Sequence, residues 1–279
     1  MIKTIVVHID GSAQQASRLQ AAAMLANEHE AHLIGSAVTG TTWSSYALLA
    51  GPMGAGMIDA DFQAMRRSAA ARLASFEEKA RGLGVVSFES RLIEDEAYFA
   101  LLLQSRYADL VVVSQDGDPD LDSPARLRGL PEHLALHGAR PVLVVPENYR
   151  GTSLTRSVLV GWDGSVQAIR AIGAALPLLR RAASVRLALL NPDQRSTLHG
   201  EEPGTDMALY LSRHGVDVEV AVERTAGSEG EALANMARDA EAGLIVAGAY
   251  GHSRYREWAL GGVTRDLLEW SPLPLLLAH

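Results

Sequence analysis

The sequence contains an internal duplication, which has to be identified before any shorter motif is interpreted. The segment IVVHIDGSAQQASRLQAAAML, beginning at Ile5, returns as VLVGWDGSVQAIRAIGAALPL, beginning at Val158, a shift of 153 positions. Further along, ADLVVVSQDG from Ala108 returns as AGLIVAGAYG from Ala242 at a shift of 134. The chain therefore holds two copies of one unit, and the difference between 153 and 134 gives the first copy 19 additional residues.

Each copy alternates strand patterns with helix patterns. Its first apolar strand ends in Asp-Gly-Ser, at Asp10 and Asp163, and apolar residues at helical spacing follow. Four more strand patterns complete the copy, and this alternation indicates a parallel sheet with helices on both faces. We therefore expect an α/β fold of two tandem Rossmann-like, doubly wound domains, each a five-stranded parallel sheet flanked by helices. The predicted domains span residues 1–147 and 153–279, joined by the linker PENYRGTS.

Two kinds of helix start are predicted. The Asp or the Ser of Asp-Gly-Ser can cap the helix after the first strand of each copy, so Asp10 and Asp163 also have a purely structural interpretation. In the second copy, Ser228 and Glu231 form the pattern Ser-x-x-Glu, which predicts a capping box.

Composition and charge exclude several classes of protein. Apolar residues make up 48% of the 279 residues and aromatic ones only 5%, as expected of helices packed on buried strands. The formal net charge of -8, with no stripe of Lys and Arg, argues against DNA or RNA binding. The absence of cysteine excludes disulfides, cysteine-zinc sites and thiol catalysis. No apolar run approaches membrane-spanning length and no leader precedes the first strand, so we expect a soluble, cytoplasmic protein without a membrane partner.

The loop after the fourth strand of the second copy is the candidate ligand site. Ligands of doubly wound sheets bind at the carboxyl ends of the strands, where the strand order reverses. The loop and the start of the next helix read GAYGHSRYREWALGGVTRD, residues 248–266. Gly248 and Gly251 would allow tight turns and let backbone amides approach a ligand, and His252 and Arg254 can donate hydrogen bonds from their side chains.

The end of this loop resembles an anion site. Gly261 and Gly262 lie at the entrance to a helix that should begin near Val263. Their amides and the hydroxyl of Thr264 would point at an anion, which the helix dipole also favours. The alternative that these glycines only shape loops stays open.

The corresponding loop of the first copy departs from this pattern. Ser114 replaces Gly248, and Pro131 falls opposite Thr264, which removes a hydroxyl and an amide. Carboxylates would repel a phosphate, and the loop carries four of them: Asp116, Asp118, Asp120 and Asp122. These aspartates do not follow the calcium-loop pattern of EF-hands, because Leu121 stands where the sharp-turn glycine belongs. We expect that the first copy has lost its phosphate site.

The spacing Gly248-x2-Gly251-x9-Gly261-Gly262 resembles the universal stress protein family, whose ATP-binding members carry Gly-x2-Gly-x9-Gly followed by Ser or Thr. Gly262 stands in place of that Ser or Thr, which leaves an amide but no hydroxyl. The resemblance covers both copies, so the chain is similar to a tandem member. The first domain would have a degenerate phosphate loop and the second a nearly intact one.

The resemblance implies a stress-response regulatory protein that binds ATP, with Mg²⁺ as a candidate companion ion. It also implies that Asp163 lies beside the nucleoside and that the end of the second strand, near Leu190, contacts the base. Single-domain relatives pair as dimers, so the two domains should be related by a pseudo-twofold axis, in a pseudo-dimeric monomer or a homodimer of such chains. With no P-loop and no nucleophile elbow in the chain, we expect no catalytic residues and at most weak ATP hydrolysis.

The sequence allows several alternatives for the function of the protein and for the structure of the additional residues. The protein could instead be a nucleotide-independent scaffold or a chaperone-like protein with a protein partner, because Gly262 lacks a hydroxyl and the first loop is degenerate. The additional residues of the first copy should lie between Trp43 and Asp61. They could form a lid over the first pocket, a partner surface, or an extended helix and loop packed by methionines.

Overall fold

The computed structural model describes residues 1–50, 55–116, 128–151, 153–195, 202–250 and 262–279. All its strands join one sheet of ten, in the order β3-β2-β1-β4-β5-β10-β9-β6-β7-β8. The first half supplies β1 (Thr4–His8), β2 (His32–Val38), β3 (Phe88–Ile93), β4 (Leu110–Ser114) and β5 (Val142–Val145). The second half supplies β6 (Val158–Gly161), β7 (Val185–Leu190), β8 (Val218–Glu223), β9 (Leu244–Gly248) and β10 (Leu275–Ala278).

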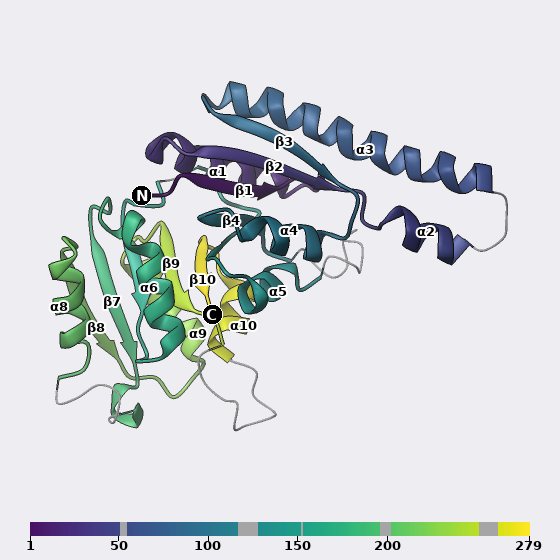
Figure 1. Cartoon of the computed structure of the whole chain (residues 1–279). Helices are drawn as coiled ribbons and strands as arrows, with labels where there is room; N and C mark the ends of the chain where they lie inside the picture. The colour runs from purple at the N-terminus through teal and green to yellow at the C-terminus, as the bar shows by residue number, and fades with distance from the viewer. Residues whose placement is uncertain (51–54, 117–127, 152, 196–201, 251–261) are drawn as a thin grey trace.

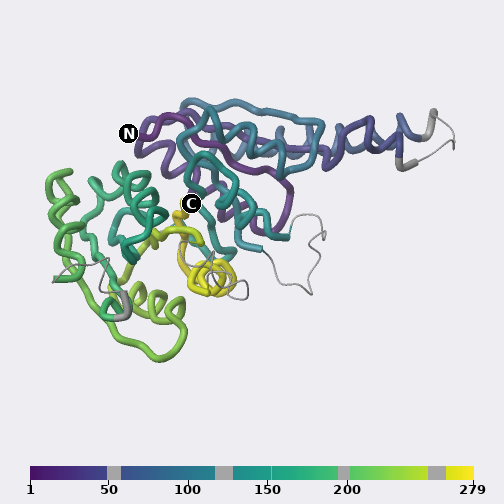
Figure 2. Tube along the Cα trace, turned by 60° about the horizontal axis from the view of Figure 1, so that its bottom comes forward, coloured from purple at the N-terminus to yellow at the C-terminus, as the bar shows by residue number. Residues whose placement is uncertain are grey.

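Each half is a parallel five-stranded sheet, and the halves meet at β5 and β10. These two strands pair antiparallel, with Leu276 opposite Leu143, while every other pairing in the sheet is parallel. The order of the second half therefore mirrors that of the first about the β5–β10 pair, as a pseudo-twofold axis requires. Figure 2 shows the halves as two lobes with the C terminus between them. The predicted fold of two tandem domains is confirmed.

Helices cover both faces of the sheet because successive buried strand residues point to opposite sides. Ile5 and Val7 of β1 belong to one apolar cluster and Val6 to the other. The first face is covered by α1 (Gln15–His29), α3 (Ala55–Gly82), α6 (Val166–Leu179) and α8 (Thr205–Arg213) (Figure 1). The second face is covered by α4 (Ala97–Ser105), α5 (Leu130–His137), α9 (Glu229–Asp239) and α10 (Gly262–Trp270). A short 3-10 helix, η2 (Pro192–Arg195), follows β7.

The additional residues of the first half build a helical hairpin. The helix α2 (Trp43–Ala50) leads into α3, whose 28 residues make a rod about 42 Å long. Both project beyond the sheet (Figure 1), and the rings of Tyr46 and Phe62 hold them together with centroids 6.4 Å apart. Of the alternatives for this segment, the described residues show the extended helix. Met53 lies outside the described residues, so the packing by methionines stays a prediction.

The expected helix starts are confirmed in the second half and wrong in the first. Ser165 caps α6 by accepting a hydrogen bond from the Ala168 amide at 3.1 Å, and Ser228 caps α9 in the same way from Glu231 at 3.2 Å. In the first half, α1 begins only at Gln15, and Ser12 bonds to the Asp10 carboxylate instead. Neither Asp10 nor Ser12 caps α1.

None of the described helices is long and apolar enough to cross a membrane. The predicted cytoplasmic location stays a prediction.

Candidate functional site

The predicted site residues of the second half that the structure describes gather at the carboxyl edge of the sheet. Gly161, the last residue of β6, pairs with Ala188. Asp163 follows two residues later, and Leu190, two residues after Ala188, is the last residue of β7. Gly248 ends β9, on the other side of β6. The strand order reverses between β6 and β9, so this edge is the switch point of the fold.

Asp163 forms a tight turn before α6. Its carboxylate accepts a hydrogen bond from the Ser165 amide at 3.0 Å, and Gly164 between them adopts a left-handed φ of 79°. The turn leaves the capping of α6 to Ser165. Asp163 is thus placed at the strand end by a local turn, rather than used as the helix cap.

Gly248 is required for packing and not for a tight turn. A Cβ built on Gly248 would lie 2.6 Å from the amide nitrogen of Ala168 and 2.7 Å from the carbonyl carbon of Gln167. The end of β9 therefore rests directly on the backbone of α6. A left-handed conformation is adopted two residues later by Tyr250, whose φ is 57°.

Thr264 holds this turn. Its hydroxyl is buried, accepts a hydrogen bond from the Tyr250 amide at 3.1 Å, and donates to the Gly248 carbonyl at 3.5 Å. The contacts of the hydroxyl are thus with the loop itself, whereas the sequence predicted that it points at an anion. Its role as a phosphate ligand stays a prediction.

The start of α10 is open. The helix begins at Gly262, which is exposed and has no atom within 4 Å of an added Cβ, and Val263 packs partly against the core. The first amides of a helix have no partner inside the helix, so they favour an anion. Four further predicted residues lie outside the described residues: Gly251, His252, Arg254 and Gly261.

The end of β7 holds one residue that the sequence argument missed. Leu190 is buried in the core, and Asn191 after it adopts a left-handed φ of 46°. The Asn191 side chain donates to Glu229 at 3.1 Å and accepts from the Thr225 amide at 2.9 Å. An Asn directly after an apolar strand is the signal that could have indicated this turn, because Asn tolerates the left-handed region.

In the first half, side chains fill the same edge. Arg18 is 1% exposed and donates to the Asp10 carboxylate at 2.6 Å and to the Ser114 hydroxyl at 2.9 Å. The positions that match Arg18, Ser114 and His8 in the second half are all small residues: Ala171, Gly248 and Gly161. Ser114 also donates to the Gln14 carbonyl at 3.4 Å. Its side chain occupies the place where Gly248 lets α6 approach, which explains why α1 begins later than expected.

The charges of this cluster shift two pKa values. Burial alone would raise the pKa of Asp10, but the Arg18 guanidinium, His8 and the Ser12 amide hold it well below its usual range. Burial, followed by the repulsion of Arg18, lowers the pKa of His8 to about 4. Asp10 is therefore charged and His8 neutral at pH 7.

Two contacts cross between the halves near these loops. Gln115, directly after β4, donates to the carbonyl of Ser271 at 2.9 Å, just after α10. The carboxylate of Glu132, in the first turn of α5, acts on the hydroxyl of Tyr250. Burial and Glu132 raise the pKa of Tyr250, and burial also raises the pKa of Asp116, which accepts a hydrogen bond from the Gly129 amide at 2.7 Å.

Two histidines on α5 also escaped the sequence argument. His133 and His137 lie one helical turn apart, with ring centroids separated by 4.6 Å. In the part of the chain that the structure describes, no group of three or more His, Asp or Glu side chains is arranged to hold a metal ion.

The sequence profile of the universal stress protein family matches this chain twice, over residues 1–146 and 155–279. The chain belongs to the universal stress protein family. No curated protein matches this sequence.

Solved structures agree with the family on the fold. A universal stress protein from Archaeoglobus fulgidus is 15% identical, with a TM-score of 0.69 over 99% of this chain and 97% of its own. A putative universal stress protein from Pseudomonas aeruginosa is also 15% identical, with a TM-score of 0.60 over 99% of this chain and 93% of its own. Another universal stress protein, solved in complex with cAMP, is 25% identical over 52% of this chain and 97% of its own, with a TM-score of 0.38. That ligand belongs to that protein alone.

Proposed function

We propose that this universal stress protein is a stress-response regulator that binds ATP, or a related adenine nucleotide, in its second half only. One observation carries the proposal. At the switch point of the sheet the second half has Gly161, Ala171 and Gly248 where the first half has His8, Arg18 and Ser114. The second half thus lacks the three longer side chains that fill this edge in the first half, and its loop has the family spacing.

The phosphates would bind at the start of α10. Gly262 is exposed, and the amides of the first helical turn together with the helix dipole attract an anion. Mg²⁺ would accompany the phosphates as their counter-ion. The Gly-x2-Gly-x9-Gly spacing brings Gly251 and Gly261 to the same ligand, on the strength of the sequence alone.

The nucleoside would lie between Asp163 and Leu190. These two residues lie at the carboxyl ends of the neighbouring strands β6 and β7. A carboxylate accepts hydrogen bonds from the hydroxyl groups of a ribose, and the apolar end of β7 suits the face of a base.

A phosphate series tests this proposal. The protein, stripped of nucleotide, is titrated by calorimetry with adenosine, AMP and ATP in the presence of Mg²⁺, and the affinity should rise with each phosphate. In the variant Gly262→Asp the new carboxylate should weaken ATP roughly tenfold and leave adenosine unchanged, because like charges at this distance cost on the order of 1.4 kcal/mol. Gly173→Asp, at an exposed glycine of α6 with equally open surroundings, is the matched control.

A nucleotide-independent scaffold or chaperone-like protein is the second candidate. The engagement of the Thr264 hydroxyl with Tyr250 and Gly248 favours it, because that hydroxyl already bonds to two backbone groups of the protein. Protein purified without nucleotide, whose melting temperature does not move with ATP, would support the scaffold. A Kd for ATP in the micromolar range or below would overturn it. Hydrolysis above background would add an enzymatic role.

A further inference from the structure

One long side chain covers the ends of two neighbouring strands of the first half, β1 and β2. Arg72 of α3 lies across the ends of β1 and β2. Its Nη2 atom donates to the carbonyl of Val38, the last residue of β2, at 2.9 Å. A Cβ built on Gly11, just beyond β1, would lie only 2.9 Å from the Cδ atom of Arg72. The aliphatic part of the Arg72 side chain thus packs beside the end of β1, while its guanidinium reaches the end of β2.

In the part of the second half that the structure describes, no arginine takes the place of Arg72. Gly11 corresponds to Gly164 at the shift of 153. The strand register matches Ser36 with Ala188, so Val38 corresponds to Leu190. Arg72 lies ten residues before the end of α3 at Gly82, whereas the equivalent helix, α8, has nine residues in all. The arginine is therefore carried by the longer helix of the first half, in the same copy as the helical hairpin (Figure 1).

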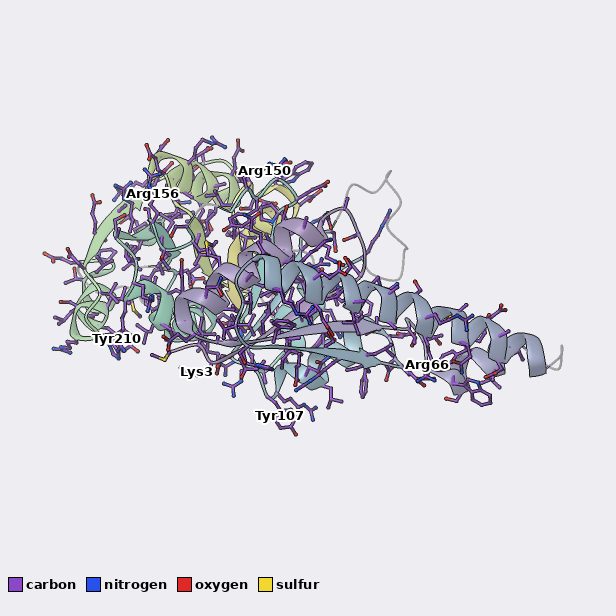
Figure 3. All side chains as sticks on the ribbon, turned by 90° about the horizontal axis from the view of Figure 1, so that it is seen from above. Lys3, Arg66, Tyr107, Arg150, Arg156 and Tyr210 are labelled. Carbon is purple, nitrogen blue, oxygen red and sulfur yellow. The ribbon has the colours of Figure 1, made fainter. Side chains whose placement is uncertain are left out.

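Neighbouring contacts show that Arg72 belongs to this edge. Its Nη1 atom donates to Ser68 one turn earlier on α3 at 3.1 Å, and the charge of Asp10 acts on its guanidinium. Further along the rod, Arg66 instead pairs with Glu94 beyond β3 at 2.9 Å (Figure 3). The Nε atom of Arg72 is buried, and no described group bonds to it. Arg72 is thus held by partners on three sides but incompletely satisfied, as a substitute occupant would be.

The guanidinium of Arg72 contacts the end of β2 in the way that a bound ligand could. A guanidinium is a flat group that presents N–H donors in its plane. Its donor edge meets a strand-end carbonyl, as the amino group of a purine base would. The Asp10 carboxylate beside it still has 17% of its side-chain surface exposed. We propose that Arg72 is an intramolecular occupant of the space between the ends of β1 and β2 and keeps a nucleoside out of it.

Removal of the occupant is the test. The variant Arg72→Ala should bind adenosine at one more site per chain than the wild type, by calorimetry. Adenosine is the probe because the aspartates of the first-half loop disfavour phosphates. The matched control is Arg67→Ala, an exposed arginine of the same helix, which should keep the wild-type stoichiometry. A folded Arg72→Ala protein with unchanged stoichiometry would overturn the proposal.

A second measurement does not depend on nucleotide at all. Ethylguanidinium is the fragment that Arg72→Ala removes, so it should raise the melting temperature of this variant saturably. It should not stabilise the wild type or Arg67→Ala, and ethylammonium should not replace it. An Arg72→Ala protein that ethylguanidinium does not stabilise, or does not fold, would mean that Arg72 is a structural residue and no occupant.

The choice of adenosine rests on the proposed function, and the ethylguanidinium rescue does not. A wild type without any nucleotide site, together with a rescued Arg72→Ala variant, would remove the proposed function and leave the occupant in place. A wild type with one ATP site, together with an Arg72→Ala variant that neither gains a site nor is rescued, would support the proposed function and overturn the role of Arg72 as an occupant.

Discussion

The carboxylate of Glu132, in the first half of the chain, acts on the hydroxyl of Tyr250 in the second half. Tyr250 lies in the loop after β9, in a left-handed conformation, with its amide bonded to Thr264. Glu132 lies in the first turn of α5. The loop in which we place the phosphates is therefore anchored both to its own helix and to the first half.

Tyr250→Phe tests this anchor. Loss of the hydroxyl should lower the free energy of unfolding by about 1 kcal/mol, because its interaction with the Glu132 carboxylate is removed. The loss should vanish when Glu132 has already been replaced by Ala, so a double-mutant cycle in urea should show coupling. Tyr107→Phe, at a tyrosine that is 79% exposed (Figure 3), is the control and should be neutral. Additive effects of the two substitutions would show that the contact contributes nothing.

The two glycines at either end of the second-half loop should respond in opposite ways to alanine. Gly248→Ala forces a Cβ to within 2.6 Å of the α6 backbone, so it should destabilise the fold by about 1–3 kcal/mol. Gly262→Ala adds a Cβ with no atom within 4 Å, at the start of a helix, and should leave stability unchanged or raise it slightly. Urea unfolding of both variants measures the two effects. Equal losses of unfolding free energy would refute the packing role of Gly248.

The two Asp-Gly-Ser motifs offer a second matched pair. Ser165→Ala removes the N-cap of α6 and should cost about 1 kcal/mol of unfolding free energy. Ser12→Ala removes only a bond to Asp10 outside α1 and should cost less. Thermal melts of the two variants give the comparison, and a larger loss for Ser12→Ala would contradict the assigned caps.

The buried His8 should make stability depend on pH. Burial and Arg18 lower its pKa from 6.5 to about 4, so the folded protein keeps it neutral while the unfolded chain protonates it below pH 6.5. Neutral His8 thus makes its full contribution to the free energy of unfolding above about pH 6.5. This contribution, about 3 kcal/mol in total, is lost as the pH falls toward 4. His29, whose pKa burial also lowers to about 4, adds a loss in the same range.

His8→Gln should therefore flatten the dependence of unfolding free energy on pH between 4.5 and 6.5. The slope is the readout, because the substitution can also change stability at every pH. His214→Gln, at a partly exposed histidine of the second half, is the control and should keep the wild-type slope. Parallel curves for His8→Gln and the wild type would show that His8 is not the group responsible.

The sequence predicts the structural features that are decided by neighbouring residues, and it misses those that depend on residues far apart in the chain. The repeat and its apolar periodicity predicted the two parallel sheets, and the hydroxyls of Ser165 and Ser228 predicted two caps, because each is decided within a few residues. The late start of α1 was missed because it depends on Ser114, a hundred residues away.

The candidate site divides in the same way. The glycine spacing found the loop, but the packing reason for Gly248 lies on α6, and the left-handed turn falls on Tyr250, a residue type that rarely adopts it. The contact of Arg72 with Val38 requires a helix of a particular length, which no local pattern encodes.

The stoichiometry of ATP binding tests the central claim most directly. Protein stripped of nucleotide is titrated with ATP and Mg²⁺ by calorimetry, alone and as the variants Gly251→Trp and Gly117→Trp, which alter equivalent positions of the two loops. We predict one site per chain, lost in Gly251→Trp and kept in Gly117→Trp. Two sites in the wild type would contradict the asymmetry of the halves, and no binding at all would contradict the nucleotide site itself.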